Sequence, residues 1–401
     1  MKTVGDALKE HHGIGPGFDQ IRVALAVSIL FWHSFGLTYG EAWVRSIPAP
    51  FPQLVAMALP MFFALSGFLV TGSALRTNNL KIFLTFRALR ILPALIVEVS
   101  LSALVLGTML TTLPLSDYFT SGEFIEYFGS IIGRVRFALP GLFETNKVPF
   151  IVNGALWTLG AEVMCYVAIA LLMLFGYLQR RKVVLAFVIA YIAMCIGVDA
   201  IHQVPVREIL PTKSLVLCFL IGNLIFLYRD RIPLNFGCAV FAFLVSLPII
   251  ALVQYDPRFK VAVYPAVAGI SYIVVFLGLK KLPTLPLFRN GDYSYGIYIY
   301  GWPIQQSVSY LFPDHRNWWF NFMISLPLTF AFAAASWHFV ERPFLSLRKN
   351  FSYGSTEPKN YRRLAFAATL LLYGVFVSYV DDVFPLRHIF GKTAQAATPI
   401  F

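Results

Sequence analysis

Long apolar runs separated by short polar segments dominate this chain. A membrane-spanning helix needs about 20 mostly apolar residues to cross about 30 Å of hydrocarbon, and eleven runs approach that length. They lie at about 21–38, 54–75, 91–112, 155–178, 183–201, 214–228, 234–254, 261–279, 293–311, 319–340 and 364–380. The sixth and the eleventh are the weakest. The pattern predicts an all-α fold, a polytopic transmembrane helix bundle of ten to eleven spans.

Charge supports this interpretation. Of the 401 residues, 58% are hydrophobic and 13% are charged, whereas a soluble domain carries about 25% charged residues. The net charge of +12 is spread beside the apolar runs, so we expect a lipid bilayer and no nucleic acid as partner. Most of the 32 Lys and Arg residues fall on one side if the N-terminus is cytoplasmic. The positive-inside rule then predicts a cytoplasmic N-terminus and, with eleven spans, an external C-terminus.

The runs follow one another through short loops, which predicts one membrane domain. We expect a cytoplasmic segment at 1–20, the membrane domain at 21–345, a cytoplasmic linker with an additional span at 346–380, and an external tail at 381–401. The longest external loop, 113–153, is expected to lie as an amphipathic helix at the interface or to fold over an external cavity. The four cysteines lack metal-ligand spacing, so we expect no metal.

Ten residues, nearly all apolar, separate Arg22 from His33. On a helix this spacing carries His33 about 16 Å from Arg22. With Arg22 at the membrane surface, His33 would lie near the middle of a hydrocarbon core about 30 Å thick. An ionisable residue at that depth indicates a functional site, although a histidine that only hydrogen-bonds to a neighbouring helix is equally compatible.

Arg87 and Arg90 are three residues apart and therefore share one helical face, where two guanidinium groups can act on one phosphate. Ordinary positive-inside anchoring is the alternative. Arg22, Arg76 and Lys81 border the same surface. Together they predict a basic rim that would suit a polyanionic donor or acidic lipid headgroups.

Glu98 and Glu162 are carboxylates inside predicted spans, and buried acids need a cation or a polar cavity. Either could orient or ionise His33, and Glu98 equally fits a structural pairing with another helix. The ninth span carries tyrosines and glycines in YSYGIYIYGWPIQQ, and we expect Pro303 to break it near mid-depth. Such a helix could line a polar acceptor cavity, or it could serve close packing with interfacial aromatic residues.

Six of these stretches, in order, resemble signatures of the acyltransferase-3 family of membrane O-acyltransferases. They are FDQIRVALAVSILFWH (18–33), PMFFALSGFLVTG (60–72), FRALRILPA (86–94), LWTLGAEVMCY (156–166), YSYGIYIYGWPIQ (293–305) and FVERPF (339–344). In one departure, Gly301 stands where the family commonly has a histidine before its Trp-Pro pair. The fused external esterase-like domain of some relatives is not expected here.

The resemblance implies transfer of an acyl group, usually acetyl, from cytoplasmic acetyl-CoA to a hydroxyl of a cell-surface or secreted glycan. The expected partners are acyl-CoA and a glycan or lipid-linked glycan acceptor, and the expected location is the bacterial cytoplasmic (inner) membrane. Acetyl-CoA would serve as the donor substrate, without a metal. The oligomeric state cannot be inferred from the sequence.

The resemblance also assigns roles to residues, with His33 acting as a general base or as a transient acyl carrier. The catalytic residues would be His33, Glu162 and Asp19, the donor-binding residues Arg22, Arg87 and Arg90, and the acceptor-binding residues Trp157, Tyr298, Trp302 and Gln305. A competing hypothesis is a proton-coupled transporter or flippase in which His33, Glu98 and Glu162 carry protons. A non-catalytic scaffold is a third, but it leaves the buried histidine unexplained.

Overall fold

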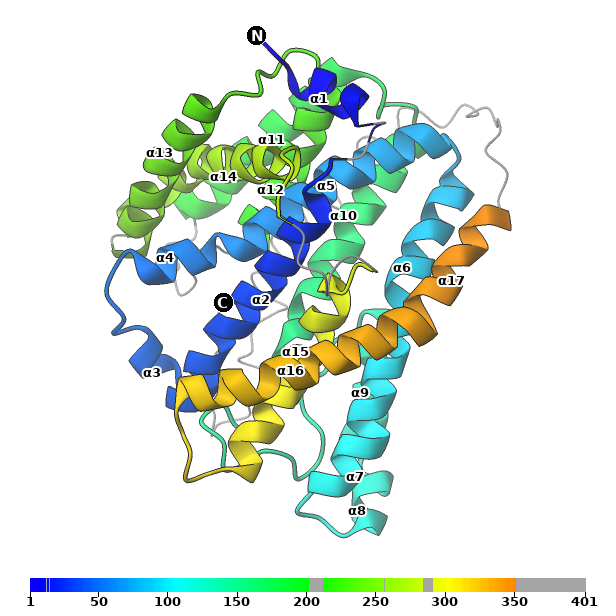
Figure 1. Ribbon diagram of the computed structural model, residues 1–401, viewed down its shortest axis with the longest axis vertical. Helices are drawn as coiled ribbons and strands as arrows, with labels where there is room; N and C mark the ends of the chain where they lie inside the picture. Colours follow the sequence, from blue (N-terminus) through cyan, green and yellow to red (C-terminus); the bar gives the residue numbers. More distant parts are fainter. Residues whose placement is uncertain (12, 14, 202–211, 256, 284–290, 351–401) are drawn as a thin grey trace.

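The computed structural model describes residues 1–11, 13, 15–201, 212–255, 257–283 and 291–350. Within those ranges the chain forms helices joined by loops, and its only β-type pairing is an isolated bridge between Thr3 and Pro233. The helices pack into one bundle (Figure 1). The expected all-α polytopic fold is therefore confirmed.

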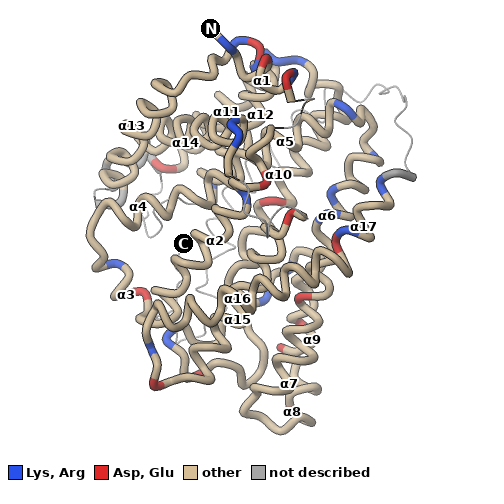
Figure 2. The backbone as a smooth tube through the Cα atoms, viewed as in Figure 1, with Lys and Arg blue, Asp and Glu red and all other residues tan. Residues whose placement is uncertain are grey.

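Most of the bundle consists of long helices, and short ones cap its two ends. The helices are α1 (Val4–Glu10), α2 (Phe18–Tyr39), α3 (Glu41–Val44), α4 (Phe51–Ala56), α5 (Ala58–Thr77), α6 (Leu80–Leu101), α7 (Gly107–Leu110), α8 (Leu115–Thr120), α9 (Gly122–Tyr127), α10 (Trp157–Leu174), α11 (Arg181–Ile201), α12 (Thr212–Leu227), α13 (Phe236–Tyr255), α14 (Val263–Gly278), α15 (Ser294–Leu311), α16 (Trp318–Ser336) and α17 (Arg342–Ser346). We call the two ends of the bundle the α1 end and the α8 end. Basic residues are dense around α1 and along α6 and α17 (Figure 2).

Seven helical segments of the described chain are long and apolar enough to cross a membrane. They are Phe18–Tyr39, Phe51–Thr77, Leu80–Leu110, Gly154–Leu174, Arg181–Asp199, Phe236–Val253 and Trp318–Ser346. Two further apolar helices, α12 and α14, are shorter. Every expected run from 21–38 to 319–340 coincides with a helix, whereas the run 364–380 lies outside the described residues.

The third span begins earlier than expected. α6 starts at Leu80, where the Asn79 side chain accepts a hydrogen bond from a backbone N–H of the first turn, and a π-helical turn continues it into α7. Arg87 and Arg90 consequently lie within the helix, not before it. Hydropathy predicted the boundary after the arginines because it counts their charges without seeing their contacts inside the bundle, such as the ion pairs of Arg90.

Pro303 does not break its helix, contrary to expectation. α15 runs continuously from Ser294 to Leu311. Proline has no N–H, so the carbonyl of Ile299, four residues earlier, lacks its usual helical donor. The Asn153 side-chain amide donates to that carbonyl at 2.8 Å. A neighbouring segment thus replaces the missing hydrogen bond, and the helix continues.

The loop 113–153 folds into the bundle against α15 and does not form one interfacial helix. After α8, α9 and a short 3-10 turn, the chain becomes irregular and buries large side chains such as Phe143. Gln306 Nε2 donates to the carbonyls of Val148 and Ile151, both at 2.7 Å. Asn146 Nδ2 donates in turn to Gln306 Oε1 at 2.8 Å. The buried backbone of the loop therefore obtains its partners from α15.

α5 and α12 cross at two glycines. A Cβ built on Gly67 would lie 2.0 Å from the carbonyl oxygen of Phe219, and one built on Gly222 would lie 2.1 Å from that of Ala64. The two backbones are in direct contact, as in other membrane helix pairs with small residues at their interface. A side chain larger than hydrogen cannot be accommodated at either position without separating the helices.

We expect Gly222→Ala to destabilise the protein by about 1–3 kcal/mol, because the added methyl overpacks this crossing. Gly197→Ala in α11 is the matched control, since a Cβ there meets no atom within 4 Å. Thermal unfolding of the detergent-solubilised variants measures the difference. Equal melting temperatures for the two variants would contradict the close crossing.

Candidate functional site

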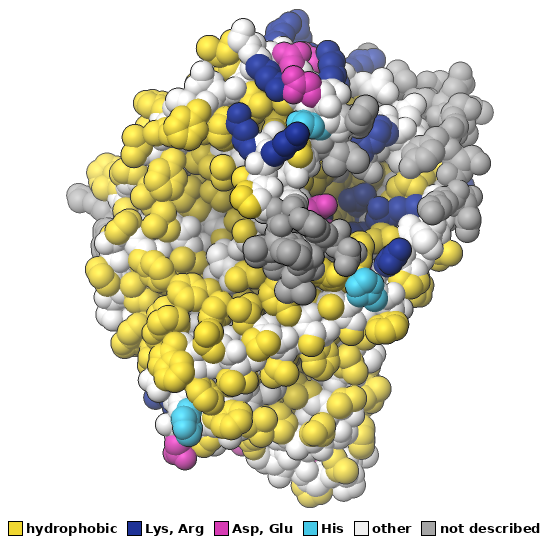
Figure 3. Space-filling model, in the orientation of Figure 1, with side chains coloured by type: hydrophobic (Ala, Val, Ile, Leu, Met, Phe, Trp, Pro, Cys, Tyr) yellow, Lys and Arg dark blue, Asp and Glu magenta, His cyan; other side chains and the backbone are white. Residues whose placement is uncertain are grey.

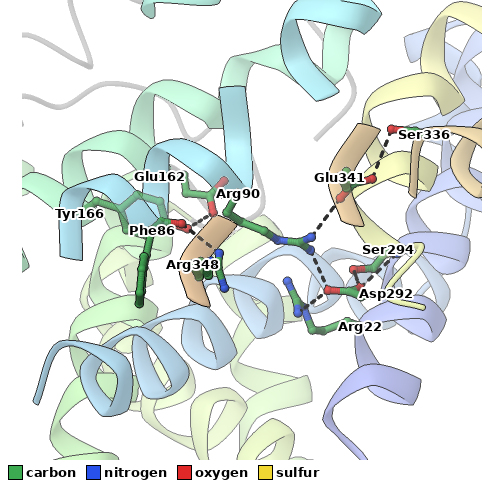
Figure 4. A network of polar contacts seen from close by, with 10 residues as sticks. All are labelled: Arg22, Phe86, Arg90, Glu162, Tyr166, Asp292, Ser294, Ser336, Glu341 and Arg348. Carbon is green, nitrogen blue, oxygen red and sulfur yellow. Dashed lines mark hydrogen bonds and ion pairs between the residues drawn. The ribbon is translucent and has the colours of Figure 1, made fainter. Parts of the chain in front are cut away.

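A cluster of charges joins four parts of the chain around Asp292, which lies two residues before the first residue of α15 (Figure 4). Asp292 Oδ2 accepts from Arg22 Nη1 at 2.6 Å and from Arg90 Nη2 at 2.7 Å. Arg90 Nη1 donates to Glu341 Oε2 at 2.9 Å. Ser294 Oγ donates to the other oxygen of Asp292 at 2.5 Å. We call Arg22, Arg90, Asp292 and Glu341 the ion cluster.

Charges in the ion cluster balance, with two guanidinium groups facing two carboxylates. Arg90 and Asp292 are each 13% exposed and Glu341 is 2% exposed, so an unpaired charge here would be costly. Burial disfavours the Asp292 carboxylate, but Arg22 and Arg90 outweigh that effect and lower its pKa to about 2. The stabilisation by Asp292 is therefore complete above its ordinary pKa of 3.8 and is lost as the pH falls through about 2.

Arg87 has different surroundings. Its Nη2 lies 3.4 Å from Ser73 Oγ, and its guanidinium lies 5.8 Å from the ring centroid of Phe83 and 5.7 Å from that of Tyr166. Tyr166 also donates a hydrogen bond to Glu162. Among the described residues, no carboxylate forms an ion pair with Arg87, and its Nε has no hydrogen-bond partner. Of the two motif arginines, Arg90 is neutralised by direct partners and Arg87 is not.

His33 is buried on α2 at 4% exposed. Its ring meets the indole of Trp302 edge-on, with centroids 4.7 Å apart and planes inclined by 73°. One turn further along α15, Gln305 Nε2 donates to the carbonyl of Leu30 at 2.9 Å. α15 is therefore attached to α2 by an aromatic contact at His33 itself and by a hydrogen bond at Leu30, three residues earlier in α2.

The contacts between α2 and α15 show that these helices run parallel. Arg22 meets Asp292 near their beginnings, and His33 meets Trp302 further along both. The eleven residues from Arg22 to His33 correspond to a helical rise of about 16 Å. The ten residues from Asp292 to Trp302 correspond to about 15 Å. The ion cluster and His33 thus occupy two levels of the same helix pair, as the spacing of Arg22 and His33 led us to expect.

Glu98 lies on α6 about 12 Å beyond Arg90, by helical rise. It is fully buried, and its Oε1 accepts from Ser102 Oγ at 2.8 Å and from Asn153 Nδ2 at 2.9 Å. Both donors are neutral. In the described part of the chain, Glu98 forms no ion pair, so of the two expected surroundings, a cation or a polar cavity, it has neutral polar contacts with α6 and the loop.

Other expected site residues occupy the surroundings of these two levels. Tyr298 shares a hydrogen bond of 2.7 Å with Thr158 and donates to the carbonyl of Ala155 at 3.1 Å. Trp157 begins α10 and packs against the core. Asp19 lies in the first turn of α2, close enough to Asp292 and Arg22 to interact electrostatically.

Three residues were not assigned to the site from the sequence: Asp292, Asn153 and, beyond its role as a helix-end anchor, Glu341. A usable signal existed for the acids, because each adjoins or lies within a matched motif and buried arginines require counter-charges.

The described residues contain no group of three or more His, Cys, Asp or Glu side chains that could hold a metal ion.

Gly301, the departure from the family pattern, faces α2. A Cβ built there would lie 2.7 Å from Leu30 Cδ1 and 3.9 Å from Thr329 Cγ2. Leu30 therefore fills the space where a side chain at this position would begin. A histidine could not occupy position 301 in this arrangement without displacing Leu30.

Comparisons with known proteins assign the chain to a family. The acyltransferase-3 model, described as an acyltransferase domain, matches residues 16–338. An O-acetyl transferase of Shigella phage Sf6 is 25% identical over 348 residues, covering 82% of this chain and 96% of the relative. Nodulation protein 10 of Rhizobium leguminosarum bv. viciae is 28% identical over 372 residues, covering 86% and 97%.

A longer relative is matched over part of its length. The putative peptidoglycan O-acetyltransferase YrhL of Bacillus subtilis (strain 168) is 22% identical over 371 residues, covering 83% of this chain and 55% of the relative. No solved structure matches significantly. Because the family model covers most of the chain and the helices are those of an integral membrane protein, the chain belongs to the acyltransferase-3 family of membrane O-acyltransferases.

Proposed function

We propose that this protein transfers an acyl group, acetyl in the first instance, from acyl-CoA at the α1 end to a glycan hydroxyl that enters from the α8 end. The observation that carries the proposal is the parallel α2–α15 pair, with arginines at one level and buried His33 at the next. The names of two relatives, an O-acetyl transferase and a putative peptidoglycan O-acetyltransferase, support acetyl as the group and a glycan as the acceptor.

Donor binding requires positive charge that the protein has not already neutralised, because coenzyme A is polyanionic. Arg87 meets this requirement, whereas Arg22 and Arg90 share Asp292 and Glu341. We assign Arg87 as the direct phosphate contact. Arg22 and Arg90, whose charges are balanced by Asp292 and Glu341, would support the donor site by holding the helices that border it. Lys and Arg side chains gather in the upper part of one face of the molecule, some of them at a hollow (Figure 3).

His33 would promote the chemistry by one of two routes. As a general base, its unprotonated nitrogen takes the proton of the acceptor hydroxyl while that oxygen attacks the thioester carbonyl. The C–S bond then breaks, and the coenzyme thiolate receives the proton. As an acyl carrier, the same nitrogen attacks the thioester first and expels the coenzyme thiolate. The acceptor oxygen then attacks the acyl group, the C–N bond breaks, and the released imidazole takes the hydroxyl proton. The burial of His33 would limit hydrolysis of the acyl group in either route.

The remaining site residues are proposed to support these steps. Glu162 would orient Arg87 through Tyr166, which contacts both. The carboxylate of Asp19 would reduce the net positive charge around Arg22. The residues proposed to contact the acceptor are Trp157, Tyr298, Trp302 and Gln305. In the cell we place the protein in the bacterial cytoplasmic membrane, with its α1 end in the cytoplasm.

We expect His33→Ala to reduce acyl transfer by at least about 100-fold, because no other base is assigned to the acceptor hydroxyl. Transfer of label from radiolabelled acetyl-CoA to an envelope glycan, by purified protein in liposomes, measures this. His315→Ala, on the loop between α15 and α16, is the matched control. Full transfer by the His33 variant would exclude the mechanism. Label retained on His33 without acceptor would identify the acyl-carrier route.

For Arg87→Ala we expect the KM for acyl-CoA to rise by about 10- to 100-fold, as a lost charge-assisted contact of about 1.5–3 kcal/mol implies. The protein should remain folded, because Arg87 has no ion pair with a described residue. Arg181→Ala, at a surface pair that is 43% exposed, is the control and should leave KM unchanged. Unchanged coenzyme binding by the Arg87 variant would overturn the donor-site assignment.

Arg90→Ala should behave differently from Arg87→Ala. Its removal leaves Glu341 without its cation and deprives Asp292 of one of two, so we expect about 3–5 kcal/mol of destabilisation. Adding Glu341→Gln to Arg90→Ala should restore part of the loss, because the second variant removes the orphaned charge. Melting temperatures in detergent measure both. An Arg90 variant as stable as the native protein would show that the ion cluster is not structural.

A further inference from the structure

Asn153 connects three elements of the fold at the level of His33. It is fully buried. Its Nδ2 donates to Glu98 Oε1 on α6 at 2.9 Å and to the carbonyl of Ile299 on α15 at 2.8 Å. Its Oδ1 accepts from the backbone N–H of Ala155 at 3.1 Å, in the 3-10 turn that leads into α10. The two acceptors on one side and the N–H on the other determine the orientation of the amide.

One of these contacts exists because of Pro303. The carbonyl of Ile299 is the one that Pro303 leaves without a helical donor, and Asn153 supplies the substitute. A buried carbonyl without a partner is destabilising, because it has lost its hydrogen bonds to water and gains none in the protein. The α15 backbone next to Trp302 therefore depends on the position of Asn153.

The following residue, Gly154, supports the indole of Trp302 directly. A Cβ built on Gly154 would lie 2.6 Å from the Trp302 ring, so the ring rests against the glycine backbone. The same ring meets His33 edge-on at 4.7 Å between centroids. The dipeptide of Asn153 and Gly154 thus supports both the backbone and the side chain that contact the imidazole.

Glu98 on α6 fixes the position of the Asn153 amide. Its Oε1 accepts from both Asn153 Nδ2 and Ser102 Oγ, and both donors are neutral. The contact therefore requires an acceptor oxygen at this place and does not require a negative charge. A glutamine can present the same oxygen, whereas an aliphatic side chain cannot.

We propose that Asn153, held by Glu98, is a positioning residue for His33 that acts through α15 and Trp302. The inference rests on the proposed function, in which His33 meets the acyl group. Misplacement of a reacting group by about 1 Å can cost about 100-fold in rate. Donor binding at Arg87, which lies on α6 three residues before Arg90, should be little affected.

The test compares Asn153→Ala, Glu98→Leu and Glu98→Gln in the liposome transfer assay. For Asn153→Ala and Glu98→Leu we expect kcat to fall by about 10- to 100-fold, with the KM for acyl-CoA within about twofold of native. Glu98→Gln should retain most of the native kcat, because it keeps the acceptor oxygen. Asn235→Ala is the matched control, since Asn235 caps the start of α13 and lies in another part of the fold.

A second readout needs no acyl transfer. The rate at which diethyl pyrocarbonate modifies His33, followed by mass spectrometry, should rise several-fold in Asn153→Ala and remain native in Asn235→Ala. If native protein transfers no acyl group, the proposed function fails, and the modification rate alone decides this inference. A native His33 modification rate in Asn153→Ala, or a kcat that falls only with the folded fraction, would overturn the positioning role.

Discussion

The shared carboxylate of Asp292 is the contact on which the rest of the site depends. It binds Arg22 of α2 and Arg90 of α6 at the point where α15 begins, and Glu341 completes the charge balance. Oppositely charged groups in a poorly solvated region tolerate little displacement, because a group that moves away leaves the charge of its partner unpaired. The ion cluster therefore sets the register of α15 against α2. A slip by one turn, about 5.4 Å, would separate Trp302 from His33.

The two levels of the helix pair use different interactions. At the ion cluster, full charges are neutralised by full charges. At the level of His33, the hydrogen-bond donors are neutral: Asn153 and Ser102 donate to Glu98, and Gln305 donates to the carbonyl of Leu30. We propose that this difference suits the reaction, because the donor is polyanionic whereas the acyl group and the acceptor hydroxyl are uncharged.

Periodicity and hydropathy were sufficient to predict the helices and the distance of His33 from Arg22 along α2. They failed at the start of α6, where the arginines looked external because Asp292 and Glu341, which neutralise Arg90, are distant in the sequence. They failed at Pro303 because the donor that preserves α15 comes from Asn153 in a loop. Both errors have one cause: a local pattern shows that a charge or carbonyl lacks a partner, but only the tertiary fold supplies that partner.

The entry of the acyl donor from the α1 end is tested most directly by the sidedness of donor use. Acetyl-CoA does not cross a bilayer, so labelled donor can be offered to one face of vesicles whose orientation is established by protease access to the N-terminus. We expect transfer of label to a glycan acceptor only when donor is offered at the face that exposes α1. Transfer that occurs only with donor at the α8 face would contradict it.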